Sequence, residues 1–206
     1  VATQSISGER KNKENDLWLT GGLKITPLKD WTINVDYTYN MYILSKKQHG
    51  KEILEHTANP DIVTVFPHTT PSRVKFTTDD NYYQTFNAYT DYTKSLGKHN
   101  IKLLLGYNYE TKSYRWFNAE RENLISNDLP GLGQAYGEKY NGSGQHSWAT
   151  MGYFARINYN YAERYLLELN GRYDGSSKFP KDKRFVFFPS VSAAWRISNE
   201  AFFEPA

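Results

Sequence analysis

Two groups of residues in this chain have the composition of a reactive site. The first, Asp174-Gly175-Ser176-Ser177, places hydroxyl groups beside a carboxylate, as a serine nucleophile site does. An Asp-Gly pair is also a common turn sequence, because glycine accepts a positive φ and aspartate bonds the backbone that follows it. The chain contains no G-x-S-x-G nucleophile elbow. We therefore interpret this segment as a turn and predict no catalytic residue.

The second group is the titratable residues, which predict no metal site. Histidines occur at His49, His56, His68, His99 and His146. No two of them have a ligand spacing such as H-x-x-x-H. Asp79-Asp80 lacks the D-x-D-x-D-G register of a calcium loop. Because the chain has no cysteine, thiolate zinc sites and cysteine nucleophiles are excluded. We expect no metal, no cofactor and no enzymatic activity.

Aromatic and basic residues gather at the end of one predicted strand and in the long loop that follows it. They are Tyr114, Arg115, Trp116, Arg121, Tyr136 and Tyr140. Flat rings beside guanidinium groups suit stacking on sugar rings or on peptide side chains. The same residues would also suit packing between loops or against another protein. These six are our candidate substrate-binding residues, and both interpretations stay open.

The elements that position these residues show a period of two. From Asp30 to Ile43, nearly every second side chain is apolar and the side chains between are mostly polar. Such alternation predicts a strand with one apolar and one polar side. Further runs, the second of them weaker, cover residues 16–25, 85–96, 101–110, 150–161, 165–174 and 185–197. The sequence therefore predicts an all-β, antiparallel chain of about seven strands.

The predicted strands and their connections have the dimensions of a membrane barrel. Strands of roughly 10–14 residues exceed the usual globular length and suffice to cross a bilayer at a tilt. Short connections follow Ile25, Leu96, Tyr161 and Ile197. Long connections are expected over residues 44–81 and 117–146, and a middling one over residues 175–184. This alternation is typical of a transmembrane β-barrel with short periplasmic turns and long extracellular loops.

Aromatic residues on the apolar side are expected at two levels. Those near the short turns are Trp31, Tyr159, Tyr161, Tyr165 and Trp195. Those nearer the long loops are Tyr37, Tyr39, Tyr107, Tyr109, Tyr153, Tyr173, Phe185 and Phe187. Leu103, Leu167 and Val191 belong to the aliphatic band between them. Two aromatic belts around an aliphatic band fit lipid, so we expect the apolar sides to face lipid and the polar sides to face a wet pore.

Composition limits the other classes of protein. The chain has 206 residues and a net charge of +3, which gives no reason to expect nucleic acid binding. Its mean hydropathy is −0.72, and no stretch approaches the ~18 apolar residues of a membrane helix. Single-chain bacterial barrels have an even number of strands. We therefore expect residues 1–206 to be part of a larger barrel domain, without a plug domain or a signal peptide.

The C-terminal part resembles a known family. Its matching segments are Gly152–Tyr161, Arg164–Leu167, Arg172–Phe179, Phe188–Ser192 and Ala194–Ser198. They resemble SusC/RagA-type TonB-dependent outer-membrane transporters of the Bacteroidota, and the hairpin with Gly97–Asn100 and Gly106-Tyr107 does so more weakly. The chain departs from the family pattern at Pro180 and at Phe185-Val186, where the family has a glycine and a Trp-Gly pair.

The resemblance implies a barrel of about 22 strands with an N-terminal plug domain. It also implies a SusD-like surface lipoprotein as partner, contact with outer-membrane lipid, and a TonB complex acting through a plug outside these residues. The implied activity is import of glycans or peptides across the bacterial cell outer membrane, without nucleic acid. The alternatives are a smaller outer-membrane barrel acting as an adhesin or enzyme, and a soluble β-sandwich carbohydrate-binding module.

Overall fold

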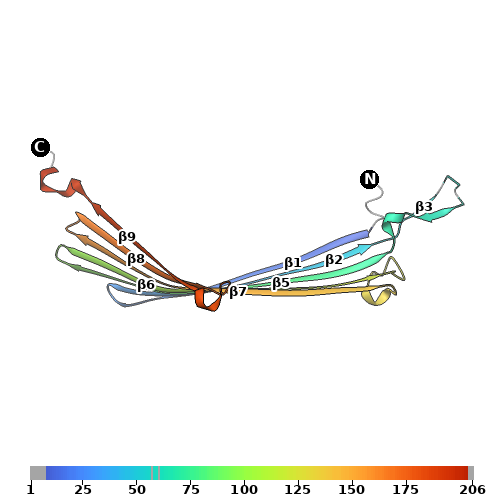
Figure 1. Ribbon diagram of the computed structural model, residues 1–206, viewed down its shortest axis with the longest axis horizontal. Coiled ribbons are helices and arrows are strands. Elements are labelled where there is room, and N and C mark those ends of the chain that lie inside the picture. The colour runs from blue at the N-terminus through green and yellow to red at the C-terminus, as the bar shows by residue number, and fades with distance from the viewer. Residues whose placement is uncertain (1–7, 57, 60, 204–206) are drawn as a thin grey trace. The chain divides into compact units, whose positions relative to one another are not determined.

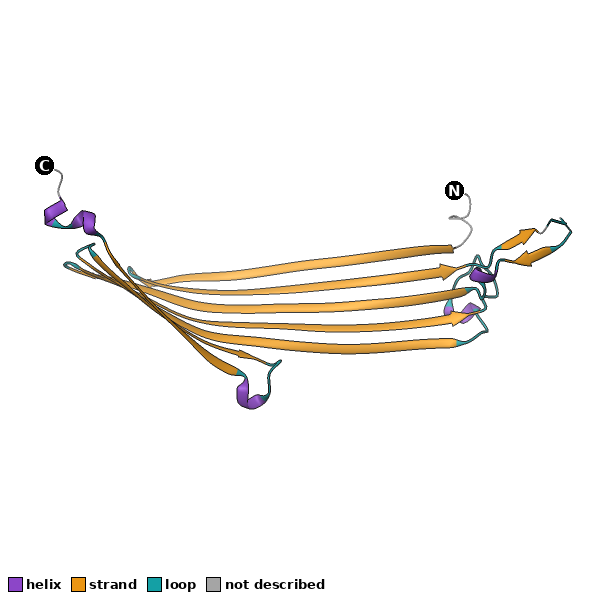
Figure 2. Ribbon diagram, turned by 45° about the horizontal axis from the view of Figure 1, so that its top comes forward, coloured by secondary structure: helices purple, strands orange, loops and turns teal. Residues whose placement is uncertain are grey.

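Seven long strands form one antiparallel sheet (Figures 1 and 2). The computed structural model describes residues 8–56, 58–59 and 61–203. The strands are β1 (Gly8–Leu28), β2 (Trp31–Gly50), β5 (Arg73–Leu96), β6 (His99–Glu122), β7 (Lys139–Tyr161), β8 (Tyr165–Ser176) and β9 (Phe185–Trp195). They pair in the order β1-β2-β5-β6-β7-β8-β9, so each long strand lies beside the next one along the chain.

Short elements occupy the connections and the end after β9. A small hairpin joins β3 (Leu54–His56) to β4 (Val63–Val65). The 3-10 turns are η1 (Pro67–Thr69), η2 (Leu132–Gln134), η3 (Lys181–Lys183), η4 (Ile197–Asn199) and η5 (Ala201–Phe203). Across the part of the chain that the structure describes, none of these helices has the length and apolar character needed to cross a membrane.

The predicted all-β, antiparallel architecture is confirmed, and the β-sandwich alternative is wrong. Every predicted strand overlaps a long strand of the single sheet. Within the described residues, the other sheet contains only β3 and β4, each three residues long. A sandwich requires two inner faces packed over a shared core. The buried apolar side chains here are Val74 and Ala135, so no such core is present in the described part.

The predicted extent of the two long loops is wrong. Five strands have 20–24 residues, well beyond the predicted length. The first long connection covers residues 51–72 rather than 44–81, and the second long connection covers 123–138 rather than 117–146. The added strand segments, such as Ser113–Glu122 and Arg73–Asn81, have polar residues on both sides. Backbone pairing continues there although the apolar alternation has stopped.

The predicted short connections after Ile25, Leu96 and Tyr161 are confirmed as tight turns, whereas Ile197 is followed by η4 and η5 and by no strand in the described residues. Between β7 and β8, Ala162 and Glu163 have φ values of 53° and 55°, and the amide of Arg164 donates to the carbonyl of Tyr161 at 2.9 Å. Positive φ at both central residues matches the right-handed twist of the flanking strands. Between β5 and β6, Gly97 has φ 58°, which glycine accepts without strain.

The chain divides into two compact units, each described here by itself. The belt unit contains Trp18–Asn40, Tyr83–Lys112 and Ser147–Ala206, and so holds the short turns and both predicted aromatic belts. The loop unit contains Val1–Leu17, Met41–Tyr82 and Ser113–His146, and so holds the two long connections.

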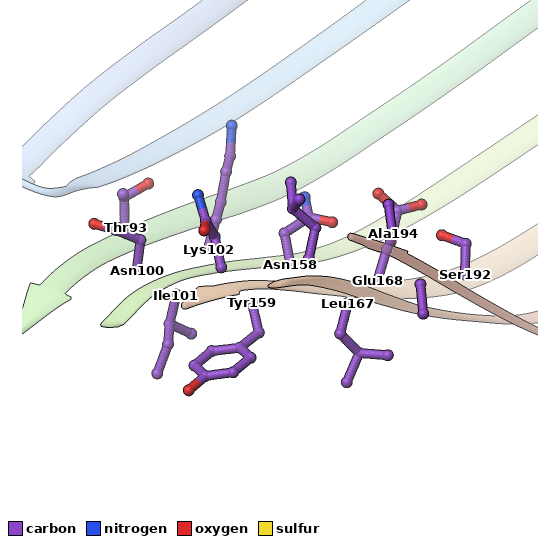
Figure 3. Close-up of a pocket in the computed structure, with 13 residues that line it drawn as sticks. Thr93, Asn100, Ile101, Lys102, Asn158, Tyr159, Leu167, Glu168, Ser192 and Ala194 are labelled. Carbon is purple, nitrogen blue, oxygen red and sulfur yellow. The ribbon is translucent and has the colours of Figure 1, made fainter. Parts of the chain in front are cut away.

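Side chains in the belt unit alternate between two chemically different faces. Figure 3 shows Lys102, Asn158 and Glu168 on one side of the strands and Tyr159 and Leu167 on the other. The pairing register of β7 with β8 places Asn158 opposite Glu168 and Tyr159 opposite Leu167. Like side chains therefore meet across the ladder, and the sheet has one polar and one apolar face.

The apolar face of the belt unit is exposed rather than packed in a core. The exposed fractions are 37% for Leu103, 38% for Leu167 and 69% for Val191. Large apolar side chains left in contact with the surroundings over several strands mark a surface that another apolar phase covers. The prediction that these side chains point away from a closed protein interior is confirmed.

Ring contacts follow both predicted aromatic levels. Near the short turns, Tyr165 lies between Tyr161 and Trp195, with ring centroids 6.3 and 6.4 Å away. At the other level, the rings of Tyr107 and Tyr153 are 5.1 Å apart. Those of Tyr173 and Phe185 are 5.2 Å apart. Rings thus adjoin across neighbouring strands, as they do in interfacial belts.

In the loop unit, hydrogen bonds link the two long connections to each other. The amide of Asn123 donates to the carbonyl of Ser72 at 2.7 Å, and the amide of Leu124 donates to the hydroxyl of Ser72 at 3.0 Å. Leu124 also forms a β-bridge with Ala135, which is 3% exposed. The segment 123–138 is therefore held against the end of the first connection.

Candidate functional site

The polar face of the belt unit is a connected surface of amides and charges. Arg156 donates to Asn170 at 2.7 Å, and the amide of Asn170 donates to Glu168 at 2.7 Å. Asn87 likewise donates to Asp36 at 2.6 Å. Such paired polar groups give a hydrophilic wall whose hydrogen-bonding capacity is partly satisfied within the protein.

The first candidate residue, Tyr114, belongs to a cluster in the loop unit. Its hydroxyl donates to Asp79 at 3.1 Å, and the ammonium of Lys46 is 2.9 Å from the other oxygen of the same carboxylate. The ring of His146 has its centroid 5.0 Å from that of Tyr114. Partial burial, followed by the hydrogen bond to Asp79, raises the pKa of the Tyr114 phenol. Tyr114 therefore stays protonated and presents a fixed ring.

Trp116, two residues beyond Tyr114 in β6, lies on the same side of the strand as Tyr114, and its ring lies over two glycines of β7. Its indole ring covers Gly142 and Gly144 of β7 so closely that a Cβ at either position would press against it. The glycines allow a large ring to lie flat along the neighbouring strand, since no side chain stands in its way. The Trp116 side chain is partly buried, and an indole ring that stays partly accessible suits stacking on a sugar or a planar side chain.

Tyr140 adjoins the acidic end of β6. It is 50% exposed, and the charge of Glu122 is the largest cause of its raised pKa. Glu120 forms an ion pair with Lys75 at 3.1 Å. Tyr114, Trp116 and Tyr140 thus lie among acids and lysines, in a polar surface with aromatic platforms.

Arg115 lies on the opposite side of the sheet from Tyr114. Its guanidinium is 2.8 Å from Asp80, whereas Tyr114 bonds Asp79, and consecutive residues of a strand point to opposite faces. The hydrogen bond and the charge of Asp80 raise the pKa of Arg115. The structure therefore separates Arg115 from the aromatic platforms that adjoin it in sequence.

Arg121 lies in β6, just before the second long connection, and Tyr136 lies in that connection. Arg121 donates to the carbonyls of Leu132 at 3.1 Å and Gly137 at 3.5 Å, so its guanidinium bridges two points of that connection. The Tyr136 side chain is 71% exposed, while its amide is bound to Asn123 at 3.0 Å. Arg121 holds the segment that presents Tyr136.

The sequence prediction missed three partners in this site: Lys46, Asp79 and His146. All three fell within predicted loops, whereas the structure places them in β2, β5 and β7. Continuing the period-two count from the apolar parts of these strands would have placed Lys46 and Asp79 on the polar side with Tyr114.

The Asp174–Ser177 segment, which has the composition of a serine nucleophile site, makes hydrogen bonds and an ion pair within the protein. Asp174 takes an ion pair from Arg172 at 2.6 Å, and the hydroxyl of Ser177 accepts from the amide of Ala149 at 2.8 Å. The turn interpretation is wrong for Asp174, Gly175 and Ser176, which lie in β8 and pair with neighbouring strands. The turn begins at Ser177, so the third connection covers residues 177–184 rather than 175–184. Among the described residues, no three histidine, aspartate or glutamate side chains are grouped to hold a metal ion.

Comparisons with known proteins agree with this geometry. A family model described as "TonB dependent receptor-like, beta-barrel" matches residues 3–203. "TonB-dependent receptor SusC" of Bacteroides thetaiotaomicron is 28% identical over 187 residues, covering 84% of this chain and 17% of the relative. "TonB-dependent receptor P3" of Formosa agariphila is 33% identical over 116 residues, covering 55% of this chain and 12% of the relative.

A solved structure shares the fold. The structure of the RagAB peptide transporter matches with a TM-score of 0.84 and 19% identity, covering 100% of this chain and 22% of that chain. The chain thus spans less than a quarter of the length of these relatives. The resemblance to SusC/RagA-type receptors is confirmed.

Proposed function

The chain belongs to the TonB-dependent receptor-like β-barrel family, and from this we propose that it forms neighbouring wall strands of an outer-membrane nutrient transporter. The observation that supports this most is the exposed aliphatic surface between two levels of adjoining rings. Lipid is the apolar phase that covers such a surface in an outer-membrane barrel, where the backbone groups of neighbouring strands pair with one another. The proposed location is the bacterial cell outer membrane.

The proposed solute path follows the polar side of the strands. Alternation along β6 puts Tyr114 and Trp116 on the side of Lys102, which belongs to the polar face. Tyr114, Trp116 and Tyr140 are the proposed solute contacts, through ring stacking. Tyr136 is proposed as a further contact in the second long connection, and Arg121 as the residue that positions it.

The proposed solutes are glycans or peptides, and the proposed partners are a SusD-like lipoprotein and TonB. Two of the similar proteins support this: one similar structure is that of a peptide transporter, RagAB, and one relative is SusC. Arg115, on the other side of the sheet, is proposed to reach solute or lipoprotein only at the outer rim. A plug outside residues 1–206 would receive TonB. The protein is proposed to be a transporter without catalysis, as its relatives are receptors by description.

Whole-cell uptake of the intact receptor tests the transport proposal. Cells with and without the receptor are given labelled oligosaccharides and labelled oligopeptides, and a strain lacking TonB serves as the energy control. Uptake of the labelled oligosaccharides, of the labelled oligopeptides or of both should be lost in the strain without the receptor and in the strain without TonB. Retained uptake of every panel, together with a full-length protein that stays monomeric in water without detergent, would refute the proposal.

A paired substitution tests the solute site. Trp116→Ala removes the indole over Gly142 and Gly144, and should weaken solute affinity of the full-length receptor about tenfold, because stacking contributes on the order of 1 kcal/mol. Phe117→Ala is the matched control: its side chain is 54% exposed and points to the other side of β6. Equal losses in the two variants would contradict the assignment of the face.

A further inference from the structure

One pocket of the loop unit lies among lysines. It has a volume of about 590 Å³ and is lined by Gly8, Glu9, Lys11, Lys47, His49, Lys51, Asn127, Asp128 and Pro130. This volume lies within the range of about 300–1,000 Å³ found for small-molecule sites. Its residues come from β1, from β2 and the chain just after it, and from the second long connection, all within the loop unit.

The pocket is on the side of β2 opposite the proposed solute contacts. Lys46 points to the Tyr114 side, where it pairs with Asp79. Lys47, the next residue, points the other way, and its ammonium lies 5.4 Å from the ring centre of Phe76. His49 is two residues beyond Lys47 in the same strand and shares its face.

His49 is buried, and one of its ring nitrogens lacks a hydrogen-bond partner. It is 8% exposed, and its Nε2 atom has no hydrogen-bond partner in the described part of the chain. It lies ten residues beyond Tyr39 in β2, outside the belt unit. An unsatisfied buried nitrogen costs about 1–3 kcal/mol, so such an atom calls for a ligand that completes it.

The charges around His49 favour an anion. Burial first, and then Lys51 and Lys47, lower the pKa of His49, whereas Glu9 and Asp128 act in the opposite direction. Glu9 is engaged by Lys11 at 3.0 Å. The pair of Lys11 with Glu9 leaves two ammonium groups, those of Lys47 and Lys51, facing one carboxylate, that of Asp128. A bound anion would give the lysines and Nε2–H a common acceptor.

We propose that Lys11, Lys47, Lys51 and His49 form a binding site for the phosphate group of a phosphorylated saccharide. A phosphate monoester offers three acceptor oxygens and up to two negative charges to these donors, whereas a carboxylate offers two oxygens and one charge. The pocket is larger than a phosphate ion needs, and Asn127 supplies an amide for sugar hydroxyls. This site is independent of the proposed transport path.

Calorimetric titration of the full-length receptor in detergent tests the site. Glucose 6-phosphate and inorganic phosphate should bind, and glucose should not. The Lys47→Gln/Lys51→Gln double variant should weaken glucose 6-phosphate binding at least about tenfold, because it removes two charge-assisted donors. Lys13→Gln, on the same face of β1 but outside the pocket lining, should leave binding unchanged.

Sulfate separates the protein's titration from that of the ligand, because its charge is constant over this pH range. A bound dianion stabilises the imidazolium of His49, so sulfate affinity should rise as pH falls from 8 to about 5. His49→Gln should flatten this dependence while keeping a donor in the pocket. A pH dependence that persists unchanged in His49→Gln would overturn the role of His49.

The source of the phosphate is distinguished in nanodiscs. If lipopolysaccharide supplies it, intact lipopolysaccharide should compete with glucose 6-phosphate and dephosphorylated lipopolysaccharide should not. If neither competes, the ligand is a free sugar phosphate. Absence of glucose 6-phosphate binding, or equal binding by the double variant and wild type, overturns the proposal. Neither result bears on uptake of glycans or peptides, so the two proposals fail separately.

Discussion

The belt unit and the loop unit use the same strands with different side-chain chemistry. In the belt unit the two faces differ sharply, as Tyr159 and Leu167 on one side and Asn158 and Glu168 on the other show. In the loop unit both faces are polar: Tyr114 bonds Asp79 on one side, and Arg115 pairs with Asp80 on the other. Hydrogen-bonded pairing is therefore independent of the apolar pattern.

The difference between the two units shows which part of a strand the alternation of apolar and polar residues indicates. Alternating apolar side chains mark the part of a strand that meets an apolar phase, since only there must one face exclude water. Where both sides are wet, the same backbone ladder persists without that pattern. A strand can thus be about twice as long as its amphipathic part, as the 24 residues of β6 are against the run at residues 101–110.

The largest expected effect comes from a charge on the apolar face. Leu169→Arg lies mid-band, paired with Ile157 and Val191, and should destabilise the full-length receptor in lipid by about 2–4 kcal/mol. Phe117→Arg makes the same kind of change in the loop unit and should cost less than about 0.5 kcal/mol. Urea unfolding in lipid vesicles measures both. Similar losses would remove the distinction between the units.

A smaller effect is expected where a ring covers a glycine. In the belt unit Phe154 covers Gly106, so the Cβ of Gly106→Ala would collide with that ring, and we expect a loss of about 1–3 kcal/mol. Gly21→Ala, in β1 of the same unit, meets no atom within 4 Å and is the control. A loss in Gly21→Ala equal to that in Gly106→Ala would show that backbone freedom, and not the ring, sets the cost.

The two units should lose stability in different pH windows. Hydrogen bonds from Trp195 and then Tyr165 lower the pKa of Glu200, beyond the membrane-spanning part of β9. The contribution of ionised Glu200 to folded-state stability is therefore complete above the pKa of the unfolded carboxyl, about 4.3. It is lost as pH falls through the lower pKa that Glu200 has in the folded protein. The pKa of His49 is also lowered in the folded protein. In buffer without phosphate or sulfate, the free energy of unfolding should therefore fall as pH drops below about 6.5, the pKa of the unfolded imidazole.

Unfolding midpoints against pH check these windows. Glu200→Gln should remove the loss of stability below about pH 4.3 and leave the loss of stability below about pH 6.5 unchanged. His49→Gln should remove the upper loss and leave the lower one. A single acid transition, unaffected by either substitution, would contradict the assignment of one titrating group to each unit.

The smallest expected difference separates two adjacent carboxylates of β5. Asp79 takes hydrogen bonds from Tyr114 and Lys46, so Asp79→Asn should cost about 1 kcal/mol. Asp80 is paired with Arg115, whose side chain is 62% exposed, so Asp80→Asn should cost about 0.5 kcal/mol or less. Equal costs in denaturant unfolding would mean that the two faces of the loop unit are energetically alike.

Local chemistry made much of the fold predictable. The alternation from Asp30 to Ile43 and the turn residues around Gly97 set strand type, face and connection, because each depends on nearby residues. The apolar band and the aromatic belts followed from the same count. The strand segments 44–50 and 113–122 were missed, since polar residues on both sides give no period to detect.

The candidate site was predictable only in composition. Sequence spacing grouped six aromatic and basic residues around one loop, but the contacts divided them between a polar face, the opposite face and a loop brace. Asp79, thirty-five residues before Tyr114, entered the site through strand pairing. Such partners are invisible in sequence because register, rather than distance along the chain, brings them together.

By itself, the sequence determined that these strands have one lipid-compatible side, where the aliphatic band lies, and that short turns alternate with long connections. Those properties depend on single residues and their neighbours in the sequence. Only the tertiary structure decided how far pairing continues beyond the band, which ring covers which glycine, and that the Nε2 atom of the buried His49 has no hydrogen-bond partner among the described residues. Each of these depends on which strands adjoin and in what register, and long-range pairing alone sets both.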